Sequence, residues 1–201
     1  MSQEGKISEI NHRVGNIHLI LGPMYAGKTT ELIRLINRAK IAGKKCLTIK
    51  YYKDIRYDVE KLSTHDQLKI NALISEGNSL MKTLSKVKNL TDYDCLFIDE
   101  IQFYEDAATV CDQLANEGYE VTVCGLQSNF MRKTFKVISD LLGFCDHLTH
   151  LTAIDSLTGN EASFTARLTS ETQEELIGGQ ETYLAVDRSH YFAINPKTRI
   201  I

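Results

Sequence analysis

A glycine-rich segment near the start of the chain has the spacing of a phosphate-binding loop. Residues 22–29 satisfy the pattern G-x-x-x-x-G-K-S/T and lie between a predicted strand and a predicted helix. The glycines allow the backbone to wrap around phosphate oxygens, with N–H groups pointing inward beside the positive end of the helix. In this pattern Lys28 reaches the β- and γ-phosphates, and the Thr29 hydroxyl ligates Mg²⁺. We therefore expect a nucleoside triphosphate site here, in preference to a glycine-rich turn without a ligand.

Two carboxylates follow a second apolar run. Residues 96–98 are apolar and lead directly into Asp99 and Glu100. In a doubly wound sheet, ligands bind beyond the carboxyl ends of the strands. Asp99 is then placed to hold Mg²⁺ directly or through water, and Glu100 can accept the proton of an attacking hydroxyl as general base. This pair alone does not separate a kinase from an ATPase, because both need a metal carboxylate and a positioned nucleophile.

Strands and helices alternate over the part of the chain that must position these residues. Apolar runs predict strands at 17–21, 46–52, 95–98, 120–124 and 147–153. Helical periodicity predicts helices at 28–42, 78–87, 105–116 and 135–142. The alternation indicates parallel β-α-β units and an open, twisted α/β sheet.

The pattern changes after residue 153. The polar segment 53–66 predicts a loop, whereas short strands at 164–169 and 174–177, separated by glycine-containing turns, predict a small β-rich appendage. We therefore expect a polar arm, an α/β nucleotide-binding domain, the appendage and a tail. Their bounds are 1–15, 16–153, 154–193 and 194–201.

Composition narrows the class of protein. The chain has 201 residues, a formal net charge of -3 and no basic stripe, so we expect no polymeric nucleic acid as a partner. Its five cysteines form no C-x-x-C pair and several lie in apolar runs, which is typical of buried free thiols in a reducing compartment such as the cytoplasm. The first 15 residues are polar and no apolar run is long enough to span a bilayer, so we expect neither a signal peptide nor a membrane anchor.

Between residues 17 and 192 the chain resembles the type II thymidine kinase family, the group that includes the cytosolic vertebrate and poxviral enzymes. The matching segments, in linear order, are 22–32, 53–57, 64–66, 98–103, 129–135, 165–168 and 177–179. So many ordered segments are more specific than a phosphate loop alone. The resemblance implies a P-loop, RecA-like parallel sheet flanked by helices, with residues 154–193 forming a small lasso domain over the nucleoside site.

The resemblance also implies roles for individual residues. Glu100 would be the base on the thymidine 5′-hydroxyl, assisted by Lys28 and Arg56, with Mg²⁺ held by Thr29 and Asp99. The residues expected to bind ATP phosphates are Gly22, Met24, Tyr25, Ala26, Gly27, Lys28, Thr29, Thr30, Asp54 and Arg56. The residues expected to bind the nucleoside are Met24, Gln102, Phe103, Leu126, Asn129, Phe130, Phe135, Thr165, Arg167, Leu176, Gly178 and Tyr183. On spacing alone, Phe130 and Phe135 are explained equally well as core residues.

The expected reaction belongs to deoxynucleotide salvage for DNA synthesis. ATP phosphorylates thymidine to give dTMP and ADP, dTTP acts as feedback inhibitor, and the usual assembly of the family is a homotetramer, with a dimer as the alternative. Two other functions stay open: a non-catalytic regulator that binds dTTP or ATP, and a kinase for another pyrimidine nucleoside such as deoxyuridine. The presence of Lys28, Thr29, Asp99 and Glu100 favours the enzyme, because a pure sensor would not need the base.

One departure from the family concerns the base of the lasso domain. The family fastens it with a structural zinc held by two C-x-x-C pairs, but the aligned positions here are Asp155, Thr158, Asp187 and His190. All four thiolates of a closed tetrahedral site are therefore replaced. We expect no structural zinc, and expect hydrogen bonds among Asp155, Asp187, His190 and nearby backbone to hold the segment instead.

Overall fold

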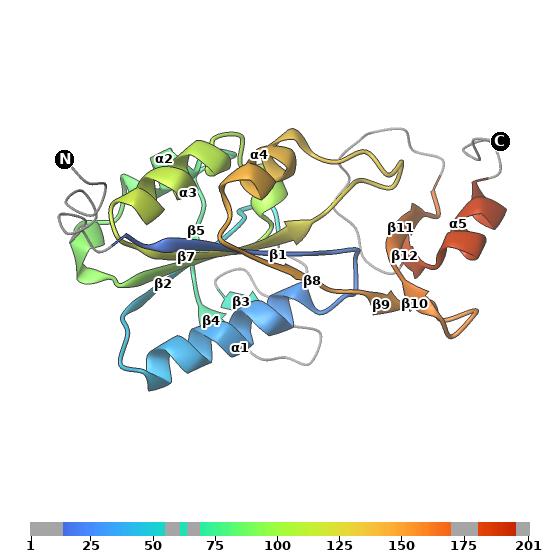
Figure 1. The fold of residues 1–201 in the computed structure, drawn as a ribbon, viewed down its shortest axis with the longest axis horizontal. Helices are drawn as coiled ribbons and strands as arrows, with labels where there is room; N and C mark the ends of the chain where they lie inside the picture. Colours follow the sequence, from blue (N-terminus) through green and yellow to red (C-terminus); the bar gives the residue numbers. More distant parts are fainter. Residues whose placement is uncertain (1–13, 55–60, 64–68, 170–180, 196–201) are drawn as a thin grey trace, which may run out of the picture.

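A six-stranded parallel β-sheet forms the middle layer of the protein in a computed structural model (Figure 1). The structure describes residues 14–54, 61–63, 69–169 and 181–195. The strand order is β5-β2-β6-β7-β1-β8, and each neighbouring pair is parallel. The strands are β1 (Asn16–Gly22), β2 (Cys46–Lys50), β5 (Leu73–Ile74), β6 (Cys95–Ile98), β7 (Glu120–Leu126) and β8 (His147–His150).

Helices cover both faces of this sheet. Helix α1 (Lys28–Ile41) lies on one face, and α2 (Leu80–Leu84), α3 (Ala107–Asn116) and α4 (Lys136–Phe144) lie on the other (Figure 1). Along β1, Ile20 packs in the cluster that includes α1, whereas Leu19 packs in the cluster that includes α3 and α4. Successive strand side chains point to opposite faces. A strand that is buried on both faces is expected to be mostly apolar, and four of the five residues 17–21 are apolar, the exception being the partly buried His18.

The order of the central strands decides where the functional residues meet. Strand β7 pairs with β1 on one side and with β6 on the other. The phosphate loop after β1 and the acidic pair after β6 are therefore both at the carboxyl edge, with one strand between them. This is the RecA-like arrangement, and it confirms the expected fold class.

Two small antiparallel sheets and a helix follow the main sheet. Strands β9 (Ala153–Ile154) and β10 (Glu161–Ala162) form one sheet, and β11 (Phe164–Arg167) and β12 (Tyr183–Val186) form the other. Helix α5 (Arg188–Ile194) comes next, and all of these lie beyond one end of the main sheet (Figure 1). The sequence reasoning did not predict β12 or α5. The available signal was Asp187, whose side chain caps α5 by accepting a hydrogen bond from the His190 N–H.

Some element boundaries were wrong, each for a local reason. The segment predicted as a polar loop contains β3 (Lys61–Ser63), which pairs with β4 (Lys69–Asn71) as a hairpin. The polar sequence gave no sign of this hairpin, because strand pairing is made by backbone groups. The last predicted strand of the main sheet ends at His150, and Ala153 begins the separate strand β9. The predicted strand 174–177 lies outside the described residues.

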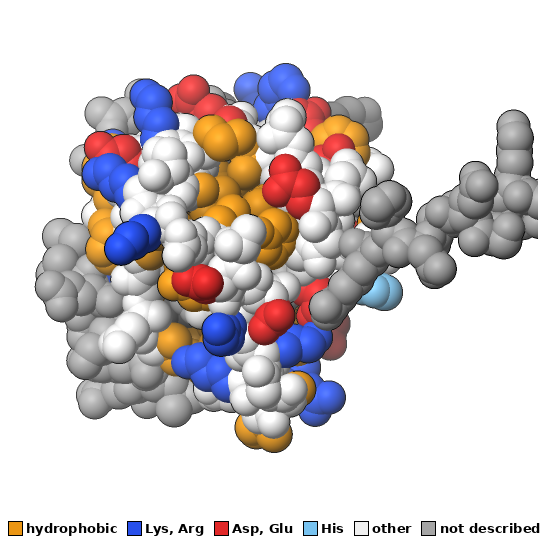
Figure 2. Space-filling view, turned by 90° about the vertical axis from the view of Figure 1, so that its left-hand side faces the viewer, with side chains coloured by type: hydrophobic (Ala, Val, Ile, Leu, Met, Phe, Trp, Pro, Cys, Tyr) orange, Lys and Arg blue, Asp and Glu red, His pale blue; other side chains and the backbone are white. Residues whose placement is uncertain are grey.

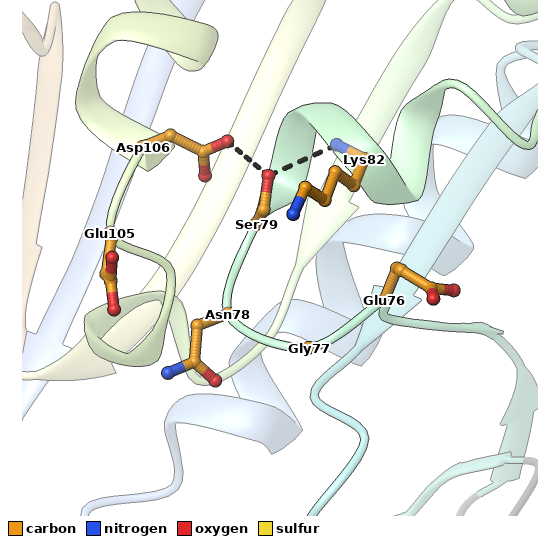
Figure 3. Close-up of a pocket in the computed structure, with 7 residues that line it drawn as sticks. All are labelled: Glu76, Gly77, Asn78, Ser79, Lys82, Glu105 and Asp106. Carbon is orange, nitrogen blue, oxygen red and sulfur yellow. Dashed lines mark hydrogen bonds between the residues drawn. The ribbon is translucent and has the colours of Figure 1, made fainter.

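The helices α2 and α3 begin later than the periodicity predicted, because hydrogen bonds between them fix their ends. The Asp106 carboxylate accepts a hydrogen bond from the Ser79 hydroxyl at 2.7 Å (Figure 3). It also accepts one from Leu80 N at 2.7 Å. Ser79 in turn accepts a hydrogen bond from Lys82 N at 3.2 Å (Figure 3). Helix α2 therefore starts at Leu80, after its Ser79 cap, and α3 starts at Ala107, after the residue that binds α2.

The face of the molecule far from α5 is mixed in character. Figure 2 shows hydrophobic side chains near its centre, with Lys and Arg interspersed with Asp and Glu around them. Within the described ranges, no helix has the length and apolar character needed to cross a membrane.

Two isoleucines of α1 provide a matched test of this packing. Ile36 is 0% exposed and Ile41 is 87% exposed. We expect Ile36→Ala to lower the free energy of unfolding by about 3 kcal/mol, because it leaves a cavity between α1 and the sheet. Ile41→Ala should change it by less than about 0.5 kcal/mol. Urea unfolding followed by circular dichroism measures both, and equal effects of the two substitutions would contradict the placement of α1.

Candidate active site

The loop between β1 and α1 has the backbone shape of a phosphate-binding loop. Gly27 has a φ of 79° and Tyr25 has a φ of 64°, in the region that glycine enters most easily. A Cβ on Gly22 would lie 2.6 Å from the carbonyl oxygen of Leu151, so a larger residue does not fit there. Gly27 also caps α1 without a side chain. The first N–H groups of a helix have no acceptor within it, and this property lets a helix start bind phosphate.

The other residues of the loop have distinct surroundings. The Lys28 ammonium donates a hydrogen bond to the carbonyl oxygen of Pro23 at 2.7 Å, so it folds back over the loop. Tyr25 and Ala26 pack against a small apolar cluster of the region after β8, which includes Ala153. Thr30 is exposed in the first turn of α1.

Thr29 and Asp99 meet across the carboxyl edge of the sheet. The Thr29 hydroxyl donates a hydrogen bond to Asp99 Oδ2 at 3.1 Å. The other carboxylate oxygen, Oδ1, accepts hydrogen bonds from Glu100 N at 2.9 Å and from Cys124 Sγ at 2.8 Å. Adjacent oxygen ligands of an octahedral Mg²⁺ lie about 3 Å apart, since each is about 2.1 Å from the metal. The hydroxyl and Oδ2 therefore have the spacing and the chemistry of two ligands of one Mg²⁺.

Several carboxylates lie close to Asp99 at the carboxyl edge of the sheet. Asp99 is 3% exposed and Asp54 is 7% exposed. Burial raises the pKa of Asp99, and the nearby carboxylates of Glu100 and Asp54 raise it further. A carboxylate whose charged form is disfavoured in this way is stabilised by a cation, so the electrostatics of the site also fit a bound metal.

Glu100 has a strained backbone and a fixed side chain. Its φ and ψ are 52° and 45°, in the left-handed region that costs a non-glycine residue energy and that occurs often at functional sites. Gln102 Nε2 donates a hydrogen bond to Glu100 Oε2 at 2.6 Å. Gln102 Oε1 accepts a hydrogen bond from Leu126 N at 3.1 Å. Gln102, expected to line the nucleoside pocket, thus connects Glu100 to the end of β7.

The region after β8 contacts the phosphate loop directly. Thr165 of β11 accepts a hydrogen bond from Met24 N at 3.0 Å through its hydroxyl, and both residues are buried. The structure therefore brings together two residues that are 141 positions apart, both of which the sequence reasoning assigned to the nucleoside site.

A second group of expected nucleoside residues gathers around Arg167. Its guanidinium carbon lies 3.8 Å from the ring centroid of Phe130, and Nη2 donates a hydrogen bond to the Tyr183 hydroxyl at 2.7 Å. Arg167 is 6% exposed and Tyr183 is 6% exposed. The buried guanidinium of Arg167 therefore lies within cation–π distance of the ring of Phe130, which is half-buried.

The remaining expected residues are more dispersed. Phe103 stacks on Tyr51, with ring centroids 4.7 Å apart. Phe103 and Phe135 both pack against the main hydrophobic core. Leu126 is half-buried at the end of β7. Asn129 is buried and organises the loop that carries Phe130, accepting a hydrogen bond from Lys133 N at 3.0 Å. Arg56, Leu176 and Gly178 lie outside the described residues.

The four positions aligned with the zinc ligands form a hydrogen-bonded cluster. Asp155 Oδ2 accepts hydrogen bonds from Asp187 N at 2.9 Å and from His190 Nδ1 at 2.8 Å. Asp187 Oδ2 accepts from the Thr158 hydroxyl at 2.9 Å and from Asn160 Nδ2 at 2.8 Å. We call this group the Asp155–Asp187 clamp, because it joins the turn after β9 to the start of α5.

The clamp does not suit a zinc ion. Each carboxylate oxygen that the ion would need already accepts hydrogen bonds, and none of the four residues is a thiolate. Structural zinc sites prefer closed sets of cysteine and histidine. Among the residues that the structure describes, no group of three or more His, Cys, Asp or Glu side chains has a metal-binding arrangement.

The pKa of Asp155 is lowered in the folded protein. Burial acts to raise this pKa, but the hydrogen bonds from Asp187 N, Leu157 N and His190 lower it by more. The Asn160 amide, the His190 N–H and the Ser189 hydroxyl hold the pKa of Asp187 well below its usual range. Both carboxylates are therefore stabilised in their charged form.

Several contributing residues were missed by the sequence reasoning. Cys124 donates to Asp99, and Asn160 and Ser189 donate to Asp187. Cys124 lies at the end of an apolar run, where a buried thiol is the ordinary interpretation. Asn160 follows a glycine in a turn, which also gives no functional signal.

A separate pocket of about 500 Å³ lies between the start of α2 and the start of α3 (Figure 3). It is lined by Glu76, Gly77, Asn78, Ser79, Lys82, Glu105 and Asp106. Ser79 and Asp106 are already engaged in the hydrogen bonds that fix the two helices, so we assign no ligand to this pocket.

The fold and the site define a P-loop nucleotide-binding protein of the α/β class. The family model for thymidine kinase matches residues 15–191. The thymidine kinase of rabbit fibroma virus (strain Kasza) is 43% identical over 178 residues, which are 89% of this chain and 97% of that protein. The thymidine kinase of variola virus (isolate Human/India/Ind3/1967) is 44% identical over 177 residues, 88% of this chain and 97% of that protein. The chain belongs to the thymidine kinase family.

Among solved structures, domain III of the Thermotoga maritima replication initiation protein DnaA matches 73% of this chain and 58% of its own, at 16% identity and a TM-score of 0.37. This similarity is too low to add to the assignment.

The Asp155–Asp187 clamp predicts a characteristic acid sensitivity. The pKa values of Asp155 and Asp187 are lowered in the folded state. As the pH falls below about 4, these two carboxylates therefore take up protons in the unfolded chain before they do so in the folded protein. The stabilisation is thus present above that pH and is lost as the pH falls further. We expect the difference in unfolding free energy between wild type and Asp187→Asn to shrink from pH 5 to pH 3, measured by urea unfolding. Asp140→Asn, in a surface pair with Lys136, is the control and should differ little from wild type. A difference that stays constant with pH would contradict the charged clamp.

The clamp also predicts the metal content of the protein. After treatment with a chelator and re-addition of zinc, elemental analysis should find well under one zinc per chain, because the oxygen acceptors are already used. The unfolding temperature should be the same with and without the chelator. One zinc per chain, retained through gel filtration, would overturn this prediction.

Proposed function

We propose that this chain transfers the terminal phosphate of ATP to the 5′-hydroxyl of thymidine, giving dTMP and ADP. The observation that carries the proposal is the meeting of Thr29 and Asp99 at 3.1 Å with Glu100 as the next residue, in a chain of the thymidine kinase family. Family membership favours this function over the non-catalytic regulator. It also favours thymidine over another pyrimidine nucleoside as the acceptor.

Mg²⁺ is the metal that the donor set suits, with Thr29 Oγ1 and Asp99 Oδ2 as its protein ligands. When bound, such an ion neutralises charge on the β- and γ-phosphates during the transfer. The hydrogen bonds from Cys124 and Glu100 N to Asp99 Oδ1 orient the carboxylate so that Oδ2 faces the phosphate loop.

The triphosphate is held by the residues 22–29 and the start of α1. The backbone N–H groups receive phosphate oxygens, and Lys28 exchanges its contact with the Pro23 carbonyl for the β- and γ-phosphates. Asp54, which is buried beside Asp99, is placed near the site of transfer, and we assign Arg56 to the same region on the resemblance alone.

Glu100 removes the proton from the 5′-hydroxyl as the oxygen attacks the γ-phosphorus. The bond between this phosphorus and the oxygen of ADP breaks, and the proton passes to the Glu100 carboxylate. Gln102 holds Glu100 Oε2 at 2.6 Å, which reduces the number of conformations that the base can adopt before the reaction. Gln102 is in this account a positioning residue.

Thymidine lies against the ring of Phe130, which Arg167 supports from within the protein, and it also contacts Met24 of the phosphate loop and Thr165. Tyr183 fixes the guanidinium of Arg167 from the other strand of its sheet. Leu176 and Gly178 are assigned to the base edge by the resemblance. The ligand dTTP combines the thymine that this site accepts with the triphosphate that the loop accepts, which supports feedback inhibition by that nucleotide.

Two further properties of the protein complete the proposal. All five cysteines are free, which supports a reducing, cytoplasmic location. We also propose a homotetramer, on the resemblance to the type II family, which sedimentation of the full chain will test.

Replacement of the base gives a direct test of the mechanism. We expect Glu100→Gln to lower kcat by about 10²–10⁴-fold, because the general base is lost. ATP affinity, measured by isothermal titration with Mg²⁺, should change little, because the phosphate loop is untouched. The control is Glu105→Gln, an exposed carboxylate on the same connection, which should retain wild-type turnover of thymidine. Full activity of Glu100→Gln would remove Glu100 from this role, and a wild-type protein that consumes no ATP with thymidine would overturn the function itself.

A further inference from the structure

Arg132 lies in the turn that follows Phe130 and has a backbone conformation that is rare for its type. Its φ is 61°, in the left-handed region that favours glycine. The turn is closed by hydrogen bonds from Arg132 N to Asn129 O and from Asn129 N to Lys133 O, each 2.9 Å. Strained backbone of this kind occurs often at functional sites, so Arg132 is a candidate for a specific task.

Three aromatic rings surround the guanidinium of Arg132. Its Cζ lies 4.7 Å from the ring centroid of Phe192, 4.9 Å from that of Tyr191 and 5.9 Å from that of Phe164. These rings belong to α5 and to the first residue of β11, and we call them the aromatic cage. All three distances are within the range of cation–π attraction. The cage therefore binds a residue of the turn to elements that lie much later in the chain.

The same cage is connected to Phe130. The Tyr191 hydroxyl donates a hydrogen bond to the carbonyl oxygen of Phe130 at 2.8 Å, and Tyr191 is 1% exposed. The ring of Phe130 is contacted by Arg167. Phe130 is thus held through its backbone by a ring of the cage and through its side chain by β11.

We propose that Arg132 is a positioning residue for the nucleoside. By occupying the aromatic cage, it fixes the turn 129–133 and so places the ring of Phe130 where thymine lies. Arg132 itself touches neither substrate. This inference rests on the assignment of Phe130 to the nucleoside site, and it adds α5 to the elements on which nucleoside affinity depends.

A positioning role and a purely structural role have different kinetic consequences. Loss of a purely structural contact lowers the stability of the protein. It leaves the KM values of the folded enzyme unchanged, or it changes the KM values for thymidine and ATP together. Loss of the positioning contact raises the KM for thymidine and leaves the KM for ATP, because the phosphate loop is held by other residues. The two KM values, measured on folded protein, therefore distinguish the roles.

Arg188 provides a matched control within the same cluster. Its Cζ lies 4.9 Å from the ring of Phe164, so it also contacts the cage, but it is exposed and belongs to α5. The test uses the full chain with Arg132→Met, Arg132→Lys and Arg188→Met, at a temperature where circular dichroism shows each variant folded. We expect Arg132→Met to raise the thymidine KM about 10-fold and to change the ATP KM by less than about two-fold.

Arg132→Lys should give an intermediate thymidine KM, because lysine keeps the charge but lacks the planar group that stacks on the rings. Arg188→Met should resemble wild type. Equal changes of both KM values, no change in either, or an equal effect of Arg188→Met would each overturn the proposal.

Two more variants keep the test decisive. If Arg132→Met does not fold, Tyr191→Phe replaces it in the test, because this change keeps the ring and removes only the hydrogen bond to Phe130. We again expect a rise in the thymidine KM without a rise in the ATP KM. The absence of this rise overturns the proposal. Phe130→Ala separates the proposal from the nucleoside assignment beneath it. A raised thymidine KM in Phe130→Ala together with an unchanged value in Arg132→Met refutes the role of Arg132 alone. An unchanged value in Phe130→Ala refutes the assignment of Phe130, and the proposal with it.

Discussion

The hydroxyl of Thr29 and the carboxylate of Asp99 follow two strands, β1 and β6, that are not neighbours in the sheet. Their contact at 3.1 Å depends on the strand between them. Strand β7 holds β1 and β6 in register on its two sides, and its own Cys124 orients Asp99. A phosphate loop without this carboxylate would bind a triphosphate but would lack the second oxygen of its metal site. The parallel sheet therefore does more than bury a core, because it sets the distance between the two oxygens of the proposed metal site.

The region after β8 reaches the phosphate loop and the loop of Phe130 by contacts that differ in kind from those in the sheet. It approaches the phosphate loop through the hydrogen bond between Thr165 and Met24 N and approaches the loop of Phe130 through cation–π contacts and the Tyr191 hydroxyl. Each is a single polar or aromatic contact of modest strength. The residues proposed to bind the nucleoside therefore depend on contacts between separate segments, whereas those proposed to bind phosphate follow strands of the sheet.

The Asp155–Asp187 clamp joins two short segments through hydrogen bonds, the role that we propose in place of a metal site. A metal ion gathers its ligands by direct coordination, and its affinity is also folding free energy. Here two buried carboxylates gather N–H and O–H donors from the turn after β9 and from the start of α5. Their charge is compensated by several donors at once, which explains why two acidic side chains are tolerated so close together in the folded state.

The phosphate loop, the strand that precedes it and the acidic pair after β6 could be predicted from the sequence, because each is encoded by neighbouring residues: a glycine pattern, an apolar run, a helix period. The partners of Gln102, Cys124, Arg132 and Asp106 could not be predicted in this way. Each of these side chains meets a residue from a segment that is remote in the sequence, and only the packing of the segments decides which atoms come within hydrogen-bonding or stacking distance. For the same reason the spacing of Phe130 and Phe135 gave no indication of their neighbours, and only the tertiary structure decided that Arg167 lies over the ring of Phe130 whereas Phe135 packs against the main core.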